Sequence, residues 1–326
     1  MEKPWVGIVT INWNNPQETL ECLKSLSGVS YDRKRIFVVD NGSSDDSVEV
    51  LSAQQQALNF TFVESKENTG FSGGCNIGMR KALEDNDISY ILFLNNDTTV
   101  APDFLDKMIE VAEGDKAGGM WAPVIYYSAR PDEIWFAGGK LRWMRVSQIG
   151  EHVIRFATRS SVFAKQSFRP TRGEIPFIYN ANKSDYFETE FITGCAMLAR
   201  RKVAQRVGEW DERFFLYFED VDYSLRAKDL GWKLHIIPSA KIWHKVSATA
   251  LGKVGSPKIL YYHHRNGMLI TKLHGPFWAN VYKHYWAAAK VKLQLLKILL
   301  GINREQSRAI IRGITDYYKG NWGKID

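Results

Sequence analysis

The stretch VGIVTINWNNPQETLECLKSLSGVSYDRKRIFVVDNGSS, residues 6–44, decides the fold of this chain. It opens with an apolar run that predicts a buried strand over residues 6–13. Asn15-Pro16 then predicts a helix start, in which Asn15 caps the helix and Glu18 closes a capping box. A second apolar strand is expected over residues 35–40. Strand, helix and strand in this order predict a parallel βαβ unit.

The same alternation continues toward residue 112. Helices are expected over 45–51, up to residue 83 and over 101–112, and strands over 59–64 and 89–95. This pattern predicts an α/β fold with a mostly parallel, doubly wound sheet. Ligands of such sheets bind beyond the carboxyl ends of the strands. Four polar clusters lie at those ends: Thr10–Asn14, Asp40–Ser44, Asn68–Gly74 and Asn95–Asp97.

The pattern loosens between Gly118 and Phe191. Short strands are expected over residues 126–143, and the polar, basic stretch 151–185 is interpreted as a flexible loop or insertion. Regular structure returns at residue 191. Helices are predicted over 202–207 and 219–230, strands over 233–237 and 240–243, and amphipathic helix from residue 259 onward.

Composition sets the broad class of the protein. With 45% hydrophobic and 24% charged residues, 326 residues suffice for one large α/β domain with an appendage. The three cysteines are expected as buried thiols in a reducing compartment. The first residues do not resemble a signal peptide, and no apolar run reaches the roughly 18 residues of a membrane span. We therefore expect a cytoplasmic protein.

Two features could contact an anionic ligand. The loop over residues 68–76 places three glycines near a helix start, where backbone amides can approach a phosphate; a tight strand-to-helix connection is the alternative. Asp97 follows the apolar strand that ends at Asn95. It could hold Mg²⁺ or Mn²⁺ together with diphosphate oxygens, or it could cap a turn before Pro102.

An acidic cluster, Glu219-Asp220-Val221-Asp222, opens the predicted helix at residue 219. Favourable interaction with the helix dipole and an Asp222–Arg226 pair would explain one or two of these acids. They do not explain three acids directly behind a run of aromatic residues. A carboxylate beside an apolar wall has a raised pKa and can act as a base. His244, after a predicted strand, is either a ligand or a packed side chain.

Several longer stretches carry a family resemblance, in the family's own order: VGIVTINWNN (6–15), IFVVDNGSSDDS (36–47), ENTGFSGGCNIG (67–78), YILFLNNDTTVAPDFL (90–105), IWFAGG (134–139), FITGCAMLARRKVAQRVGEWDERFFLYFEDVDYSLRAKDLGW (191–232) and IWHKVSAT (242–249). The chain resembles family-2 glycosyltransferases of the GT-A fold, particularly the rhamnosyltransferase-like members. The resemblance covers roughly residues 5–270, and YYHHRNGMLI (261–270) is similar to a segment that follows the catalytic domain.

The resemblance implies a role for each matching residue. Thr10 and Asp40 would hold the nucleotide base and ribose, with the 68–76 loop beside the donor. The implied donor-binding residues are Thr10, Asn12, Asp40, Asn68, Gly70, Phe71, Gly74, Asn76, Asn96 and Gly194. Asp97 takes the last position of the family's Asp-x-Asp motif, whose first position is Asn95 here.

The remaining roles concern the metal and the acceptor. Asp97 and His244 match metal ligands for Mn²⁺ or Mg²⁺, and Asp220 matches the catalytic base. Trp210, Asp211 and Glu219 would shape the acceptor site. The implied reaction is an inverting, non-processive transfer from a nucleotide-sugar, either dTDP-rhamnose or a UDP-sugar, to a glycan or lipid-linked acceptor.

The C-terminal region carries the excess positive charge. Residues 258–326 hold 12 of the 43 Lys and Arg residues but only three of the 36 acids. Pro276–Leu300 is rich in aromatic residues and lysines, which is typical of an amphipathic helix at a membrane surface. Packing on the main domain, or on a second copy in a homodimer, is the alternative.

The expected organisation is a catalytic domain over residues 1–257 and a basic helical region over 258–326. The nucleotide-binding half would cover residues 1–117 and the acceptor half 118–257. Two other classes remain open: a nucleotidyltransferase, which would place its Gly-rich loop after the first strand, and a sugar-nucleotide or glycan-binding protein. Nucleic acid is not expected as a partner, because the apolar face of the basic region fits lipid better.

Overall fold

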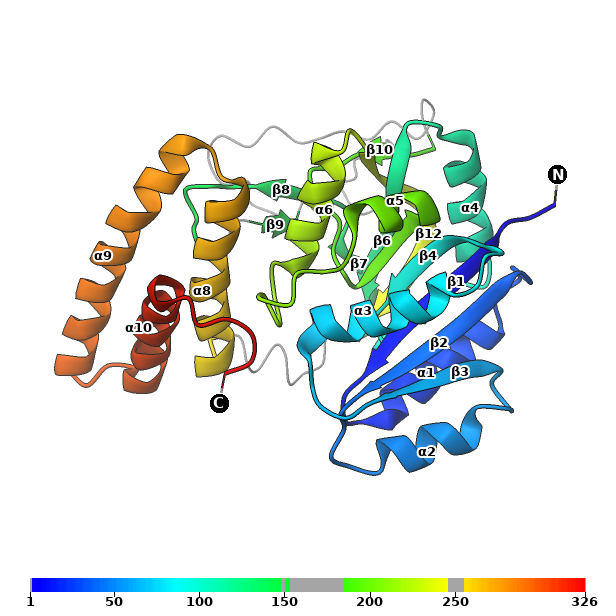
Figure 1. Cartoon of the computed structure of the whole chain (residues 1–326), viewed down its shortest axis with the longest axis horizontal. Helices are drawn as coiled ribbons and strands as arrows, with labels where there is room; N and C mark the ends of the chain where they lie inside the picture. Colours follow the sequence, from blue (N-terminus) through cyan, green and yellow to red (C-terminus); the bar gives the residue numbers. More distant parts are fainter. Residues whose placement is uncertain (1, 148–149, 153–184, 246–254, 326) are drawn as a thin grey trace.

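The computed structural model describes residues 2–147, 150–152, 185–245 and 255–325 (Figure 1). Its strands are β1 Trp5–Asn12, β2 Lys34–Asn41, β3 Phe60–Ser65, β4 Ile88–Leu94, β5 Thr98–Val100, β6 Gly118–Tyr127, β7 Arg130–Phe136, β8 Gly139–Leu141, β9 Gly150–His152, β10 Phe187–Glu188, β11 Ala196–Arg200 and β12 Lys233–His244. Its helices are α1 Pro16–Ser27, α2 Ser47–Gln54, α3 Gly70–Leu83, α4 Phe104–Gly114, α5 Arg201–Val207, α6 Glu219–Asp229, α8 Pro257–His274, α9 Phe277–Leu299 and α10 Arg304–Lys319.

A ten-stranded sheet forms the centre of the molecule. Its main path runs β10-β12-β6-β11-β4-β1-β2-β3, while β5 pairs with β12 and β7 with β6. The strands β4, β1, β2 and β3 are parallel, as are β6 and β12; β11 runs antiparallel between the two groups. The predicted mostly parallel α/β fold is therefore confirmed. The carboxyl ends of β1, β2 and β4 meet at one edge of the sheet.

Helices cover the sheet and exclude water from its strands. α3 packs on β1 and β2 so closely that a Cβ at Gly78 would stand 2.2 Å from the Val9 side chain. α4 packs on β6 and β12, and α1 buries Leu23 and Leu26. The three cysteines are buried free thiols, as expected. This close packing holds the strand ends in fixed relative positions.

The structure corrects several predicted element boundaries. Residues 118–127, where no strand before residue 126 was expected, form β6, which is buried in the middle of the sheet. Both faces of such a strand are buried, so it can be apolar throughout and lacks the alternation of a half-exposed strand. The two strands predicted over 233–243 are one strand, β12, with an irregular register after Ile237. The insertion predicted over 151–185 lies almost wholly outside the described residues.

Two predicted helix starts also differ from the structure. Asn15 precedes α1 with a left-handed backbone (φ 58°), and its side chain makes no capping hydrogen bond, so the predicted capping box is absent there. Gly70 to Asn76 belong to the first turns of α3, whereas a glycine-rich loop was predicted over 68–76. The glycines serve close helix packing here, a function that favours them as much as a loop does.

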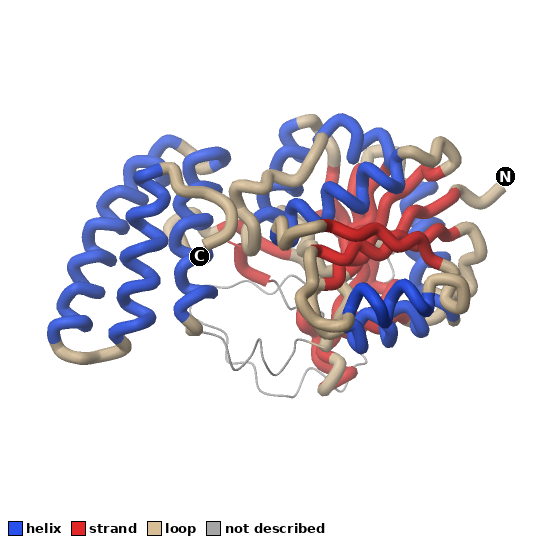
Figure 2. Tube along the Cα trace, turned by 60° about the horizontal axis from the view of Figure 1, so that its bottom comes forward, coloured by secondary structure: helices blue, strands red, loops and turns tan. Residues whose placement is uncertain are grey.

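α8, α9 and α10 form a three-helix layer beside the sheet domain (Figure 2). α8 lies between the sheet domain and α10, and α9 is the element farthest from the sheet in both views. Within the described residues, no helix is long and apolar enough to cross a membrane. The predicted amphipathic helical region is thus present, with α8 packed against the sheet domain.

Candidate active site

A chain of hydrogen bonds joins the carboxyl ends of β1 and β2. Asn12 Nδ2 donates to Asp40 Oδ2 at 2.9 Å, and the Ser43 hydroxyl donates to the same oxygen at 2.6 Å. The Thr19 hydroxyl donates to Asn12 Oδ1 at 2.7 Å, and Asn96 Nδ2 donates to Thr19 Oγ1 at 2.9 Å. The side chains of Asn12 and Asp40 are fully buried. Three of the predicted donor residues are thereby brought together, and Thr19 and Ser43 are links that the sequence did not single out.

Thr10 is also fully buried, on the same strand as Asn12. Its hydroxyl makes no hydrogen bond to any residue of the described ranges. A buried hydroxyl without a partner is uncommon, and a ligand can satisfy it. Thr10 therefore stays a predicted donor contact, now with an unused polar atom.

Asn41, at the end of β2, holds the start of α3. Its Nδ2 donates to the Gly70 carbonyl at 2.8 Å, and its Oδ1 accepts from the Thr69 hydroxyl at 2.8 Å. Asn68 Oδ1 accepts from the Gly70 amide at 2.8 Å. Gly74 packs against the Ile11 side chain and Asn41. The α3 start thus faces the end of β2, which places the predicted residues Asn68, Gly70 and Gly74 next to the Asp40 network.

Gly70 has a structural reason to be glycine. Its φ is +78°, and a Cβ there would stand 2.4 Å from the Phe215 carbonyl oxygen. The Phe71 amide donates to that same oxygen at 2.8 Å. The start of α3 is therefore joined to the segment that precedes α6.

Asp97 and His244 meet although 147 positions separate them in the chain. His244 Nε2 lies 3.1 Å from Asp97 Oδ2, because β5 and β12 pair with Thr98 opposite His244. Burial disfavours a charged imidazole, but the Cys195 sulfur and the Asp97 carboxylate outweigh burial and raise the pKa of His244 well above its usual value. The two predicted metal ligands are thus in contact.

The donor atoms of this pair fit a divalent cation. Asp97 Oδ1 is buried and makes no hydrogen bond to any described residue, so it has lone pairs to offer. One carboxylate and one imidazole suit Mn²⁺ or Mg²⁺ when phosphate oxygens complete the coordination shell. The described part of the chain holds no group of three or more His, Cys, Asp or Glu residues that could bind a metal by itself.

Asp220 lies in the first turn of α6 and is oriented by backbone amides. The Gly194 amide donates to Oδ2 at 3.1 Å, and the Val221 amide donates to Oδ1 at 2.8 Å. Burial raises the pKa of Asp220, although these amides and the Thr193 hydroxyl oppose the shift. A Cβ on Gly194 would stand 2.8 Å from the Phe71 ring, so Gly194, Phe71 and Asp220 share one small space.

The other two acids in the first turn of α6 have different environments. Glu219 is 6% exposed, its Oε2 makes no hydrogen bond to a described residue, and burial together with Asp220 raises its pKa well above the usual value. Asp222 accepts from Arg226 and bonds to His274 of α8, each at 2.8 Å. Burial opposes ionisation of Asp222, but both partners outweigh it and lower its pKa. Asp222 therefore joins α6 to α8.

The Asp97–His244 pair and Asp220 both lie near Cys195. The Asn95 amide donates to the Cys195 carbonyl at 2.9 Å, so the segment from Gly194 to Cys195 runs beside the segment that leads to Asp97. Burial raises the pKa of the Cys195 thiol, and the charges of His244, Asp97 and Asp220 all act on it. The two predicted chemical centres are therefore at the same edge of the sheet.

The predicted acceptor residues Trp210 and Asp211 lie in the loop before α6. Trp210 is 1% exposed and stacks on Tyr223 with ring centroids 4.4 Å apart, so it supports this loop from the core. Asn76 is also buried: it accepts from the Trp210 amide at 2.7 Å and donates to the Trp210 carbonyl at 3.0 Å. Asp211 is paired with Arg213. Asn76 was predicted to bind the donor, whereas its polar atoms hold the backbone of the loop before α6.

Arg265 and Asn266 belong to the segment YYHHRNGMLI, and neither was assigned a role from the sequence. Both side chains are fully buried in α8. Asn266 Nδ2 donates to the carbonyls of Phe214, Leu216 and Tyr217, and Arg265 Nη2 donates to those of Arg213 and Phe214, all at 2.8–3.0 Å. The sequence signal that could have singled out Arg265 is a charged residue on an otherwise apolar helix face. The pair holds the segment that leads into Asp220.

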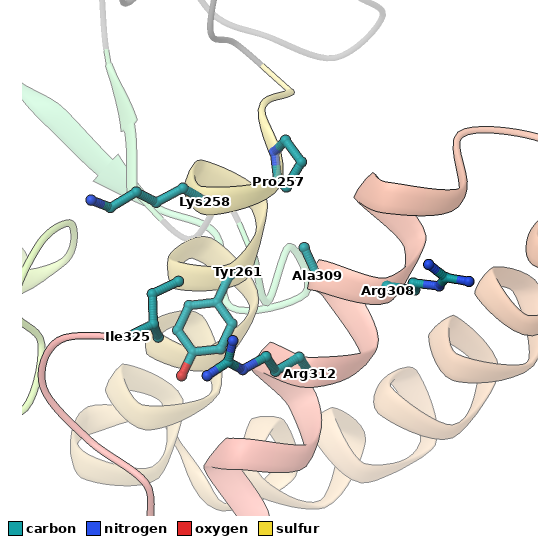
Figure 3. A pocket seen from close by; sticks show the side chains of 7 residues that line it. All are labelled: Pro257, Lys258, Tyr261, Arg308, Ala309, Arg312 and Ile325. Carbon is teal, nitrogen blue, oxygen red and sulfur yellow. The ribbon is translucent and has the colours of Figure 1, made fainter.

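A cavity of about 570 Å³ lies outside this site, between the start of α8, α10 and the C-terminal segment (Figure 3). Its lining residues are Pro257, Lys258, Tyr261, Arg308, Ala309, Arg312 and Ile325. None of the predicted site residues is among them.

The family model described as glycosyl transferase family 2 matches residues 7–208. The N-acetylglucosaminyl-diphospho-decaprenol L-rhamnosyltransferase of Mycobacterium tuberculosis is 22% identical over 290 residues, covering 83% of this chain and 85% of that protein. The galactofuranosyltransferase GlfT2 of the same species is also 22% identical, covering 82% of this chain and 41% of that protein.

Solved structures share the fold. GalNAc-T7 with UDP, GalNAc and Mn²⁺ superposes with a TM-score of 0.64 at 15% identity, over 97% of this chain and 56% of that one. The mannosyltransferase PcManGT from Pyrobaculum calidifontis, with GDP-Man and Mn²⁺, gives a TM-score of 0.55 at 14% identity, over 98% and 89%. The family match decides against the nucleotidyltransferase and binding-protein alternatives. Since it spans well over half of the sequence, the chain belongs to glycosyl transferase family 2.

Proposed function

We propose that this glycosyltransferase moves one sugar at a time, rhamnose or a hexose, from a nucleotide-diphosphate donor to a glycan or lipid-linked acceptor, with inversion at the anomeric carbon. The name of the Mycobacterium tuberculosis relative, an L-rhamnosyltransferase acting on a decaprenol-linked sugar, supports dTDP-rhamnose as the donor and a lipid-linked acceptor. A UDP-sugar remains the second donor class.

The observation that carries this proposal is the position of Asp220. Its carboxylate is held by the Gly194 and Val221 amides at the same sheet edge as Asp97 and His244. Burial raises the pKa of Asp220, which makes its carboxylate a stronger base toward an acceptor hydroxyl. The fixed amides orient the carboxylate before the acceptor arrives, so little reorganisation is needed.

The chemistry follows from one base and one leaving group. The acceptor oxygen forms a bond to the anomeric carbon as the bond to the diphosphate oxygen breaks, and the hydroxyl proton passes to Asp220. Because a single carboxylate acts on the face opposite the leaving group, the configuration inverts. Asp97 and His244 would hold the divalent cation, which supplies positive charge for the developing charge of the diphosphate.

The test is the Asp220→Asn variant. Asparagine keeps the size of the side chain and one of the two amide contacts but cannot take up a proton, so we expect transfer to fall by roughly 10²–10⁴-fold while donor binding is retained. Transfer is measured with radiolabelled nucleotide-sugar and a lipid-linked acceptor, and donor binding by calorimetry. Asp229→Asn, an exposed acid at the end of the same helix, is the matched control. Unchanged transfer in Asp220→Asn would remove it as the base.

The donor is identified by a thermal-shift screen of nucleotide-sugars in the presence of Mn²⁺ or Mg²⁺. A ligand that binds only the folded state raises the melting temperature. We expect the largest shift with dTDP-rhamnose. A larger shift with a UDP-sugar would replace rhamnose in the proposal and leave the role of Asp220 standing.

A further inference from the structure

We propose that the outer face of α9 docks the protein on the surface of an anionic lipid membrane. That face consists of Phe277, Trp278, Val281, Tyr285, Leu296 and Leu299, all of which are exposed. Phe277 is 86% exposed and Leu299 80%. Positions 277, 281 and 285 follow one another at helical spacing, so the side chains form one stripe. An exposed apolar stripe of this size marks an interaction surface.

The inner face of α9 shows that this orientation is fixed. Lys283 and Gln294 point inward, and each is only 3% exposed. Lys283 Nζ donates to Asn280 Oδ1 at 2.6 Å, and Gln294 Oε1 accepts from the Ser307 hydroxyl of α10 at 3.0 Å. Rotating the helix to bury its apolar stripe would break the Gln294–Ser307 contact to α10 and move Lys283 out of its buried position. α9 lies on the outside of the molecule (Figures 1 and 2), and the exposure of its apolar stripe shows that this side faces away from the protein.

Charge favours lipid over a second copy of the chain. α9 carries four lysines and no acidic residue, and Lys292 lies among the exposed apolar side chains. A two-fold contact through this face would bring Lys292 of both copies together without an acid of α9 to pair with it. Anionic headgroups complement Lys292, while the apolar stripe enters the boundary between headgroups and acyl chains.

The composition of the stripe suits an interface between water and hydrocarbon. Trp278 and Tyr285 combine a large apolar ring with a polar group, a combination enriched where one end of a side chain is wet. No described helix is apolar enough to span the bilayer, so α9 would lie along the surface. Docking does not depend on the proposed donor, acceptor or base.

The experiment is vesicle flotation of the full chain. One set of vesicles contains phosphatidylcholine with about 30% phosphatidylglycerol, and the other phosphatidylcholine alone. We expect flotation with the anionic vesicles. The triple variant Phe277→Ser/Tyr285→Ser/Leu299→Ser should lower the partition coefficient by about 100-fold or more, because three large apolar contacts are lost. Lys292→Glu should weaken binding to the anionic vesicles and have no effect with vesicles of phosphatidylcholine alone.

The matched control is Met144→Ser/Leu230→Ser, which removes two exposed apolar side chains from other surfaces. It should float like the unmodified protein, and all variants should keep the unmodified melting temperature and donor binding. Absence of flotation of the unmodified protein would overturn the proposal, as would wild-type flotation of the triple variant. Equal flotation with both kinds of vesicle would show that binding does not need anionic lipid, and would overturn the proposal of an anionic membrane as the partner. A dimer in sedimentation velocity that the triple variant dissociates would show a second copy to be the occupant.

Discussion

At the scale of single residues, Glu219 and Asp222 show how neighbouring acids in one helical turn acquire opposite properties. Asp222 faces Arg226 and His274, which lower its pKa despite burial. Glu219, three positions earlier, faces the apolar wall and Asp220, and its pKa is raised. Positions three apart lie on the same side of a helix, so the difference comes from the partners: Arg226 and His274 bond to Asp222, while Oε2 of Glu219 makes no hydrogen bond to a described residue. Their effects on stability should therefore differ in sign.

We expect Glu219→Gln to stabilise the protein at alkaline pH. The pKa of Glu219 is higher in the folded than in the unfolded state, so its ionisation removes stability as pH rises through the folded-state pKa. The neutral glutamine avoids that cost, which we expect to be about 1 kcal/mol or more. The melting temperature of the variant should exceed that of the unmodified protein near pH 8, and the difference should shrink toward pH 4.

Glu49→Gln, at an exposed position in the first turn of α2, is the control and should leave the pH profile of melting unchanged. Parallel melting curves of Glu219→Gln and the unmodified protein from pH 4 to pH 8 would contradict the argument.

At the scale of elements, α8 acts on the chemistry through the loop that precedes α6. Phe215, Tyr217 and Phe218 have positive φ angles of 62°, 69° and 72°, a backbone conformation that costs of order 1 kcal/mol each for such residues. Asn266 compensates with hydrogen bonds to three carbonyls of residues 214–217. Because Asp220 follows directly, the loop conformation sets where its carboxylate points.

Asn266→Ala should therefore lower kcat by about tenfold or more, because Asp220 is displaced, and remove the donor that the Leu216 and Tyr217 carbonyls share, at a cost of about 1–3 kcal/mol. Asn266→Asp, which keeps the acceptor for Arg265 but lacks the amide donor, should behave alike. Initial rates and thermal melting measure the two effects.

The control is Asn280→Ala, which removes two hydrogen bonds outside the loop before α6, one donated to the Gly275 carbonyl between α8 and α9 and one accepted from Lys283. It should lower the melting temperature and leave kcat unchanged. A loss of stability without a loss of kcat in Asn266→Ala would reduce Asn266 to a structural residue.

At the scale of the whole molecule, the site is assembled across the sheet. Asp97 follows β4 on one side of the antiparallel strand β11, while His244 ends β12 on the other side. The short strand β5 bridges this gap by pairing with the end of β12. The proposed cation site therefore depends on the complete sheet, and its two ligands come from distant parts of the chain.

Asp97→Ala should abolish the stimulation of donor binding by Mn²⁺, because the carboxylate that contacts His244 and has an unused oxygen is removed. Calorimetric titration of nucleotide-sugar with and without Mn²⁺ measures this. Asp103→Ala, an exposed acid that precedes α4, is the control and should respond to Mn²⁺ like the unmodified protein. A normal Mn²⁺ response in Asp97→Ala would exclude it as a ligand.

The sequence by itself determined the fold class and the positions of the polar strand ends. Alternating strands and helices are patterns of short range, and so is the start of α6, where aromatic residues precede three acids. The prediction that a carboxylate beside that wall has a raised pKa is confirmed for Glu219 and Asp220. The family resemblance, carried by ordered motifs, is confirmed by the family match. The implied roles of Asp220, Asp97 and His244 stay predictions.

Only the tertiary structure decided which distant residues meet. The β5–β12 pairing brings His244 to Asp97. The packing of α8 on the segment before α6 gives Arg265 and Asn266 their carbonyl partners. The orientation of α9 was also open, since an amphipathic helix shows two faces and its sequence does not say which is inward. Strand pairing and helix docking depend on contacts between segments far apart in the chain, and local periodicity contains no record of them.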